Sequence, residues 1–163
     1  MKLWLLALPW ALLAQHAVAA CVFDTNLAPR QGAPAALVDD PGLPAPEIES
    51  LDITRGASGG ATCDRLGFVT LGLRWPRGTR LDVGDLGFEY RLAAGQAPPG
   101  LVPAGVVAGP AGNGRKFEHV LAWNDDDEVR SQRLELSLEV RAVAPDGRRG
   151  QPLVVRIYAP AGR

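Results

Sequence analysis

Histidine and cysteine are scarce in this sequence, with two of each among 163 residues. His119 is the only histidine beyond residue 20, and no second histidine or cysteine stands beside it, so no zinc site is expected. A single histidine on the apolar side of a strand is usually a core or edge residue with hydrogen-bonded nitrogens, and we interpret His119 in this way.

Two other catalytic patterns are also missing from the expected elements. We expect no strand–turn–helix elbow around a nucleophilic serine of the Gly-x-Ser-x-Gly kind. The glycine-rich stretch 109–114 lacks the lysine and the following helix of a phosphate-binding loop. These shortages predict a protein that is not an enzyme and that needs no cofactor or metal.

Lysine is nearly absent, and charges of the two signs almost balance. The only lysines are Lys2 and Lys116, and the formal net charge is −1. Without residues 1–20 the chain has 16 basic and 18 acidic residues, a net charge of −2. So small a net charge does not attract nucleic acid or an anionic membrane, and neither is expected as a partner.

The sequence has no apolar run long enough to cross a membrane. Its longest, Leu3–Leu13, lies between Lys2 and a segment of small residues that ends at Ala20. This layout is typical of a secretory signal peptide over residues 1–20, and the alternatives are an N-terminal anchor or a buried helix. A core of roughly ten residues falls short of the ~20 that span a bilayer. We therefore expect a periplasmic or secreted protein without a membrane span.

Two cysteines remain after that segment, Cys21 and Cys63. In an oxidising compartment an isolated pair is expected to form one disulfide. Its loop of about 40 residues would stabilise the fold by ~3–4 kcal/mol. The alternative is a lipid anchor at Cys21, because Val18–Cys21 also resembles a lipoprotein lipobox. The disulfide is favoured because lipidation would leave the thiol of Cys63 unpaired.

Helical periodicity is missing after residue 20, and alternation with a period of two takes its place. Along Arg133–Ala144 the even-numbered positions are all leucine, valine or alanine, and the odd-numbered ones are charged or serine except Val143. Side chains alternate across a strand, so this stretch predicts a long strand with one buried face. The turn signal Pro145–Gly147 and the apolar run Leu153–Tyr158 predict an antiparallel neighbour.

Five further segments are predicted as short strands: 47–55, 66–75, 86–92, 101–108 and 116–123. The side chains expected to face the core are Val69, Leu71, Leu73 and Trp75, then Leu86, Phe88, Tyr90 and Leu92, then Phe117, His119, Leu121 and Trp123.

Seven strands of this kind, separated by turn signals, predict an all-β protein with an antiparallel two-sheet sandwich over residues 46–160. Residues 21–45 are rich in proline and alanine and are expected to form an extended leader. Segment 47–55 is expected at a sheet edge, and 101–108 can be no more than an edge strand because a proline and a glycine interrupt it.

Three segments, in order, resemble a fibronectin type III domain. Leu71–Pro76 is similar to the family's second strand, whose tryptophan packs in the core before a proline. Gly87–Arg91 is similar to the third strand, and Leu136–Gly147 to the sixth strand and its turn, with leucine where the family usually has a tyrosine. The resemblance covers residues 46–160. It implies a fibronectin type III-like or immunoglobulin-like sandwich that serves as a binding or spacer module in secreted proteins.

The one dense acidic cluster follows the segment 116–123. Its oxygen atoms, from Asp125, Asp126, Asp127 and Glu128, are ligands of the kind that Ca²⁺ prefers, and Trp123 beside them offers a platform for a sugar ring. The simpler interpretation is a solvated loop at a strand end. Arg148–Arg149 is likewise interpreted as a solvated hairpin tip, with contact to an acidic partner as the alternative.

The sequence therefore predicts an exported, non-enzymatic β-sandwich module that binds a protein or a component of the cell envelope. One alternative is a calcium-dependent carbohydrate-binding module that uses Trp123 and the acidic cluster. Another is a small periplasmic hydrolase or a hydrolase inhibitor, for which His119 beside a carboxylate in a pocket would be required.

Overall fold

The computed structural model describes residues 25–32, 36–57, 62–111 and 114–162. The predicted signal peptide, Cys21 and the side chain of Cys63 lie outside this part of the chain, and so does the expected disulfide. The strands of the described residues are β1 Val38–Asp39, β2 Glu47–Thr54, β3 Leu66–Arg74, β4 Gly87–Gly95, β5 Val106–Ala108, β6 Lys116–Asn124, β7 Leu134–Val143, β8 Arg148–Arg149 and β9 Leu153–Ala159. The helices are the 3-10 helices Thr62–Arg65 and Val83–Asp85 and the single α-turn α1, Asp127–Arg130.

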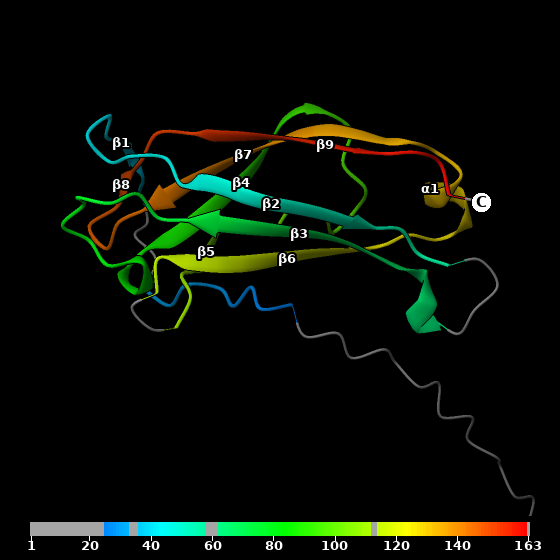
Figure 1. The fold of residues 1–163 in the computed structure, drawn as a ribbon, viewed down its shortest axis with the longest axis horizontal. Coiled ribbons are helices and arrows are strands. Elements are labelled where there is room, and N and C mark those ends of the chain that lie inside the picture. Colours follow the sequence, from blue (N-terminus) through cyan, green and yellow to red (C-terminus); the bar gives the residue numbers. More distant parts are fainter. Residues whose placement is uncertain (1–24, 33–35, 58–61, 112–113, 163) are drawn as a thin grey trace, which may run out of the picture.

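The strands form two sheets that pack against each other, so the all-β sandwich is confirmed (Figure 1). The smaller sheet has the order β2-β3-β6, and all of its pairs are antiparallel. The larger sheet has the order β1-β8-β7-β4-β5, with β9 also paired to β7. Only the short β1–β8 pair is parallel among the described strands.

The core lies between the two sheets and uses the predicted faces. On β7 the five alternate positions from Leu134 to Ala142 are all buried, and Leu138 and Val140 are 0% exposed. Burial of each such aliphatic side chain contributes about 1.5–3 kcal/mol. Trp75, Phe88 and Leu121 are buried as expected. The alternation in the sequence therefore identifies most of the core.

Leu92 is an exception, because it was expected to face the core and is 42% exposed. The pairing of β4 with β7 shifts between Leu92 and Ala94. Leu92 is still in register opposite Leu138, so the shift begins after it and does not turn its side chain away from the core face. Its exposure instead belongs to the last five residues of β4, Arg91–Gly95, which are all exposed although the strand still pairs with β7. The predicted alternation of buried and exposed residues ends there.

The helix α1 is a second difference, since no helix was expected after residue 20 and its residues were interpreted as a strand-ending loop. The carboxylate of Asp126 accepts a hydrogen bond from the backbone N–H of Val129 at 3.0 Å. An aspartate at this N-cap position satisfies one of the free N–H groups of a first helical turn. The acidic cluster therefore starts a helix.

The described part of the leader packs against the sandwich. The backbone N–H of Arg30 donates to Val106 O at 2.9 Å, and that of Ala108 donates to Ala28 O at 2.7 Å, which adds backbone pairing to the edge of β5. The side chain of Asn26 makes two hydrogen bonds to the backbone of β6, to Glu118 O at 2.7 Å and from Val120 N at 3.0 Å. The leader therefore pairs with the edge of β5 and touches the edge of β6 through one side chain.

Candidate functional site

Trp123 faces the core from β6 and is 2% exposed. Its indole N–H donates to Oδ1 of Asp125 at 3.1 Å. Because alternate residues of β6 point inward, the ring lies under the sheet and presents no face to solvent. The structure therefore corrects the suggestion that Trp123 is a sugar platform and agrees with its prediction as a core residue.

Asp125 is fully buried and forms a two-pronged ion pair with Arg55. The guanidinium donates to the two carboxylate oxygens at 2.8 and 2.9 Å, and the N–H of Gly56 donates to Oδ2 at 2.8 Å. Burial by itself would raise the pKa of Asp125, but the hydrogen bonds from Arg55, Gly56 and Trp123 outweigh it and the pKa is lowered. This carboxylate is therefore charged, and both of its oxygens accept hydrogen bonds from groups of the same chain.

The remaining guanidinium hydrogens of Arg55 bind the end of the sandwich together. They donate to the backbone carbonyls of Val129 at 3.1 Å, Gln132 at 3.2 Å and Pro160 at 3.0 Å. These three residues belong to α1, to the segment after it and to the segment after β9. Arg55 is therefore a structural hub that the sequence did not reveal, because its partners are mostly backbone atoms far away in the chain.

The other residues of the acidic cluster make different contacts. Asp126 caps α1, Asp127 pairs with Arg130, and Glu128 lines a groove. Among the residues that the structure describes, no three His, Cys, Asp or Glu side chains are placed to hold a metal ion. The five predicted binding residues therefore do not converge on one site.

His119 is buried between the sheets and 2% exposed, as predicted for a core histidine. Its Nδ1 lies 2.5 Å from the hydroxyl of Tyr90, and its ring contacts the rings of Phe88 and Phe117 at centroid distances of 5.3 and 5.0 Å. Burial lowers the pKa of His119 to about 4 and raises the pKa of Tyr90. The imidazole is therefore neutral, and its contacts are those of a core residue.

The letters Gly-x-Ser-x-Gly do occur once, at 56–60, between the predicted strands 47–55 and 66–75. Ser58 lies outside the described residues. The segment follows β2 and precedes the 3-10 helix Thr62–Arg65 and then β3. A nucleophile elbow requires a full helix after the turn, so this context is not that of the motif.

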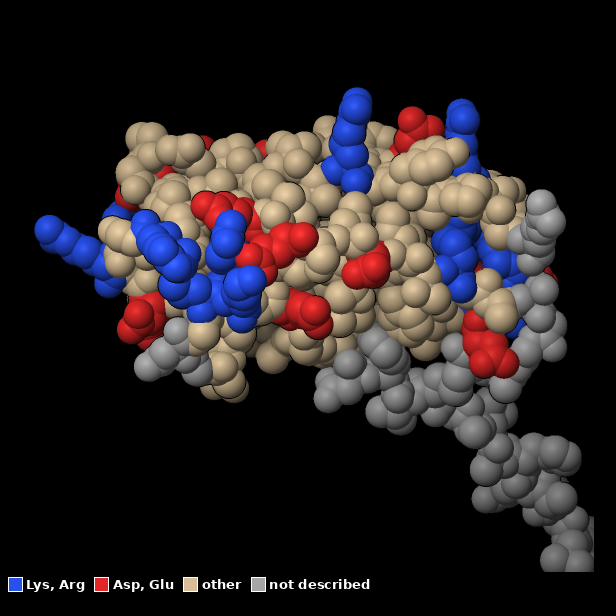
Figure 2. All heavy atoms as spheres, in the orientation of Figure 1, with Lys and Arg blue, Asp and Glu red and all other residues tan. Residues whose placement is uncertain are grey.

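Arg148 and Arg149 are paired within the chain. Arg148 contacts Asp40 at 2.9 Å and Asp146 at 2.8 Å, and Arg149 contacts Asp39 at 2.6 Å. Figure 2 shows basic and acidic side chains interleaved at this end of the molecule. The hairpin tip is therefore held against β1 by ion pairs.

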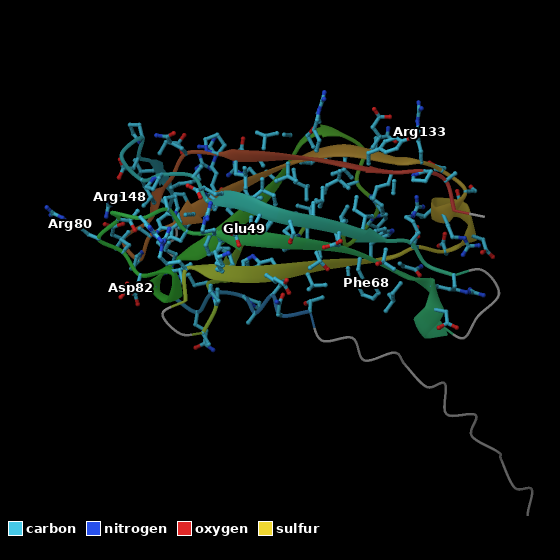
Figure 3. All side chains as sticks on the ribbon, in the orientation of Figure 1. Glu49, Phe68, Arg80, Asp82, Arg133 and Arg148 are labelled. Carbon is cyan, nitrogen blue, oxygen red and sulfur yellow. The ribbon has the colours of Figure 1, made fainter. Side chains whose placement is uncertain are left out.

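A cavity of about 580 Å³ opens at the same end, and three arginines line it, namely Arg77, Arg80 and Arg148. Figure 3 shows Arg80 extending away from the ribbon there, with Asp82 nearby. Of these three arginines, Arg148 pairs with Asp40 and Asp146, so its positive charge is offset within the chain.

A larger groove, of about 860 Å³, lies at the α1 end, over β7, β9 and the loop after β4. Figure 3 labels Arg133, which rises from the start of β7 beside this groove. Tyr158, 61% exposed, lines the groove together with Arg156 and the loop prolines Pro98 and Pro99. The groove thus combines an aromatic ring, two prolines and several arginines, and aromatic residues and arginine are enriched at protein interfaces.

The residues that line this groove are visible in the sequence, but the sequence does not show that they lie close together. Tyr158 and Arg156 are alternate positions of the predicted last strand, and Pro98–Pro99 lies between the predicted strands 86–92 and 101–108. Only the pairing of β4, β7 and β9 places them at the same surface.

Comparison of the chain with models of protein families, with curated proteins and with solved structures found no match in any of the three. The class of this protein is consequently described by its fold and its groove alone: it is a two-sheet β-sandwich with an open surface groove. In the described part of the chain, no helix has the length and apolar character needed to cross a membrane.

Proposed function

We propose that this protein is an exported, non-enzymatic β-sandwich module that binds another protein or a component of the cell envelope through the groove beside β7 and β9. The groove is the observation that carries the proposal. It holds an exposed tyrosine, two prolines and charged side chains of both signs. Tyrosine and arginine are the residues that contribute most often to binding energy at protein interfaces.

The use of the buried polar groups supports a non-enzymatic role. His119 is enclosed by aromatic rings, and Asp125 is fully hydrogen-bonded to Arg55, Gly56 and Trp123. A catalytic acid or base has to reach a substrate from a pocket. Neither residue lines the groove.

The strand order supports the fibronectin type III-like or immunoglobulin-like class. The strands β2, β3 and β6 share one sheet, and β4, β7 and β9 share the other. We count the strands along the chain without β1 and β8, which have two residues each, so that β5 is the fourth. The strands β2, β3 and β6 are then the first, second and fifth, and β4, β7 and β9 are the third, sixth and seventh. In immunoglobulin-like sandwiches the same division holds, with A, B and E in one sheet and C, F and G in the other.

Export rests on the pattern of residues 1–20, and the chemistry of Cys21 tests it. We expect the mature protein, recovered from the periplasm or medium, to be lighter by two hydrogens than the reduced chain, because Cys21 and Cys63 are joined. A mass that is several hundred daltons higher would instead identify a lipid on Cys21. Retention of residues 1–20 on a cytosolic product would contradict export.

A capture experiment with matched variants tests the groove. A photo-reactive amino acid at position 158 should cross-link a discrete partner from an envelope fraction, and the same group at position 38 should not. Val38 is a suitable control because it is 66% exposed, as open as Tyr158, and lies at the opposite end of the sandwich. Tyr158→Ser should weaken capture by roughly tenfold, whereas Val38→Ser should leave it unchanged. Equal cross-linking from both positions would contradict the proposal.

A further inference from the structure

Each sheet of a sandwich has two edges whose backbone groups can pair with another strand, and proteins usually protect them. Here the leader contacts two of the four. It pairs with β5 through Ala28 and Arg30, and Asn26 bonds to the backbone of β6 in the other sheet. The edge of β5 is therefore paired within the chain, and the edge of β6 is bonded to the leader at Glu118 and Val120.

The third edge, β2, has two protective features. Its pairing with β3 shifts between Ile48 and Ser50, which marks a bulge, and Glu47 and Glu49 carry negative charge along the strand. Bulges and charged side chains on an edge strand both discourage another strand from pairing.

The fourth edge is formed by β9 and, further along β7, by β8 and β1; β9 has no bulge and carries a single charged side chain, Arg156. It pairs regularly with β7 from Leu153 to Ala159, and no strand of the described residues pairs with its other side. No backbone hydrogen bond from this strand, beyond the β7 ladder, occurs in the described part of the chain. The strand β2 runs near β9 but pairs only with β3 (Figure 1). A regular, unpaired edge of seven residues is a template for strand addition.

The outward side chains of β9 indicate what kind of strand would fit. They are Val154, 55% exposed, Arg156, and Tyr158, 61% exposed. Arg156 has no acidic partner among the described residues, and Ser137 stands opposite it on β7. An added strand with an acidic residue opposite Arg156 and apolar residues opposite Val154 and Tyr158 would complement this row.

A second copy of the chain fits the same edge poorly. The antiparallel register that pairs most of β9 with itself places Arg156 opposite Arg156, and like charges directly opposite each other are destabilising.

We propose that β9 binds an extended segment of a partner protein as an added strand, with the outward pattern apolar, acidic, apolar. This inference rests on the proposed binding function and specifies its partner chemistry. Backbone hydrogen bonds to β9 would supply affinity, and Arg156 would supply selectivity. The end of the segment would pass Tyr158 into the groove, because Arg156 and Tyr158 also line it.

A peptide with the sequence Thr-Val-Thr-Glu-Thr-Val-Thr tests this directly, because its valines and glutamate share one face. We expect fluorescence anisotropy to show binding to the exported protein, with at least tenfold weaker binding when lysine replaces the glutamate. Proline in place of one central threonine and the valine next to it should also abolish binding, because the N–H groups of a strand point alternately to its two sides and one of these two must face β9.

The variant Arg156→Glu should reverse the preference, so that the lysine peptide binds better than the glutamate peptide. This side chain is exposed and outside the core, so the variant should keep the circular dichroism spectrum and melting temperature of the parent. Hydrogen exchange should slow at alternate amides of β9 when the glutamate peptide is bound. Absence of peptide binding, or a preference that Arg156→Glu does not reverse, would overturn the proposal.

The two proposals fail in different ways. If cross-linking of the partner depends on Tyr158 but the protein binds the glutamate and lysine peptides equally well, the groove remains the binding site and strand addition to β9 is excluded. A dimer in sedimentation that Val154→Ser and Tyr158→Ser dissociate would instead identify a second copy as the occupant and overturn the partner strand.

Discussion

Two buried polar pairs illustrate opposite ways of placing polar atoms inside this sandwich. Asp125 and Arg55 form a charged pair at the α1 end, where the guanidinium also bonds to three backbone carbonyls. His119 and Tyr90 form a neutral pair in the middle of the core, with one hydrogen bond between them and aromatic rings around them.

One pair is charged and the other neutral because the two places offer different numbers of hydrogen-bond partners. A buried charge needs several partners to offset its loss of water, and strand ends and helix turns provide them at the α1 end. Between two sheets the backbone groups are already used in the ladders, so a polar side chain there stays neutral and uses one partner. The location of each pair therefore determines its charge state.

The comparison predicts the largest loss of stability at the charged pair. Asp125→Ala leaves the guanidinium of Arg55 without its main partner, and we expect the free energy of unfolding to fall by about 3–4 kcal/mol. Urea unfolding measures this loss. Glu47→Ala is the control, because it breaks a pair with Arg74 whose side chains are 48% and 42% exposed, and it should cost less than about 1 kcal/mol. Equal losses would contradict the structural role of Arg55.

The two pairs should also respond to acid in different pH ranges. His119 has a folded pKa of about 4 against an ordinary value of 6.5, so between these values the unfolded chain takes up a proton that the folded chain does not. Stability is therefore complete above pH 6.5 and falls as the pH drops, by about 2–3 kcal/mol between pH 7 and 4.5. Asp125 has a pKa lowered from 3.8, so its contribution is lost only at more acidic pH.

Urea unfolding at a series of pH values separates these contributions. The variant His119→Gln keeps a polar group that can bond to Tyr90 but does not titrate, so the decline between pH 7 and 4.5 should disappear. A decline that persists unchanged in the variant would show that another group causes it.

A smaller effect is expected when the neutral pair is broken. Tyr90→Phe keeps the ring but removes the hydroxyl, which leaves Nδ1 of His119 buried without a partner. We expect a loss of about 1–2 kcal/mol at pH 7, the usual cost of an unsatisfied buried polar group. The double variant Tyr90→Phe with His119→Leu should recover part of it, and a further additive loss would contradict the assigned hydrogen bond.

The smallest effect is expected at the helix that supports the charged pair. Asp126→Ala removes the N-cap of α1, which should cost about 1 kcal/mol in thermal or urea unfolding. Because Val129 of α1 accepts a hydrogen bond from Arg55, this loss should shrink in an Arg55→Lys background. Glu128→Ala, at an exposed position of the same turn whose side chain makes no ion pair among the described residues, is the control and should change stability less.

The sequence was sufficient for elements whose own side chains decide their structure. The alternation at Leu134–Ala142 and at Val69–Trp75 identified both sheets and most of the core. It failed at Leu92, because Arg91–Gly95 of β4 are exposed although β4 still pairs with β7, and alternation does not show which part of a strand is covered. It also failed for α1, a single turn whose N-cap signal was interpreted as a calcium ligand or a solvated loop.

The candidate site was less predictable than the fold. Trp123 and Asp125 were recognised as neighbours, but their burial and the role of Arg55 depend on contacts across 70 residues of sequence. The groove and the free edge of β9 depend on which strands lie side by side and on where the leader binds. Such properties belong to the assembled sheets and have no local sequence signal.

The two tryptophans beyond residue 20 give this protein a pair of built-in optical reporters. Trp75 follows β3 at one end of the sandwich, and Trp123 stands opposite Gly67, near the start of β3, at the other. Their indole N–H groups bond to different neighbours, Thr79 and Asp125. Fluorescence from single-tryptophan versions would therefore follow the two ends separately and reveal whether one opens before the other.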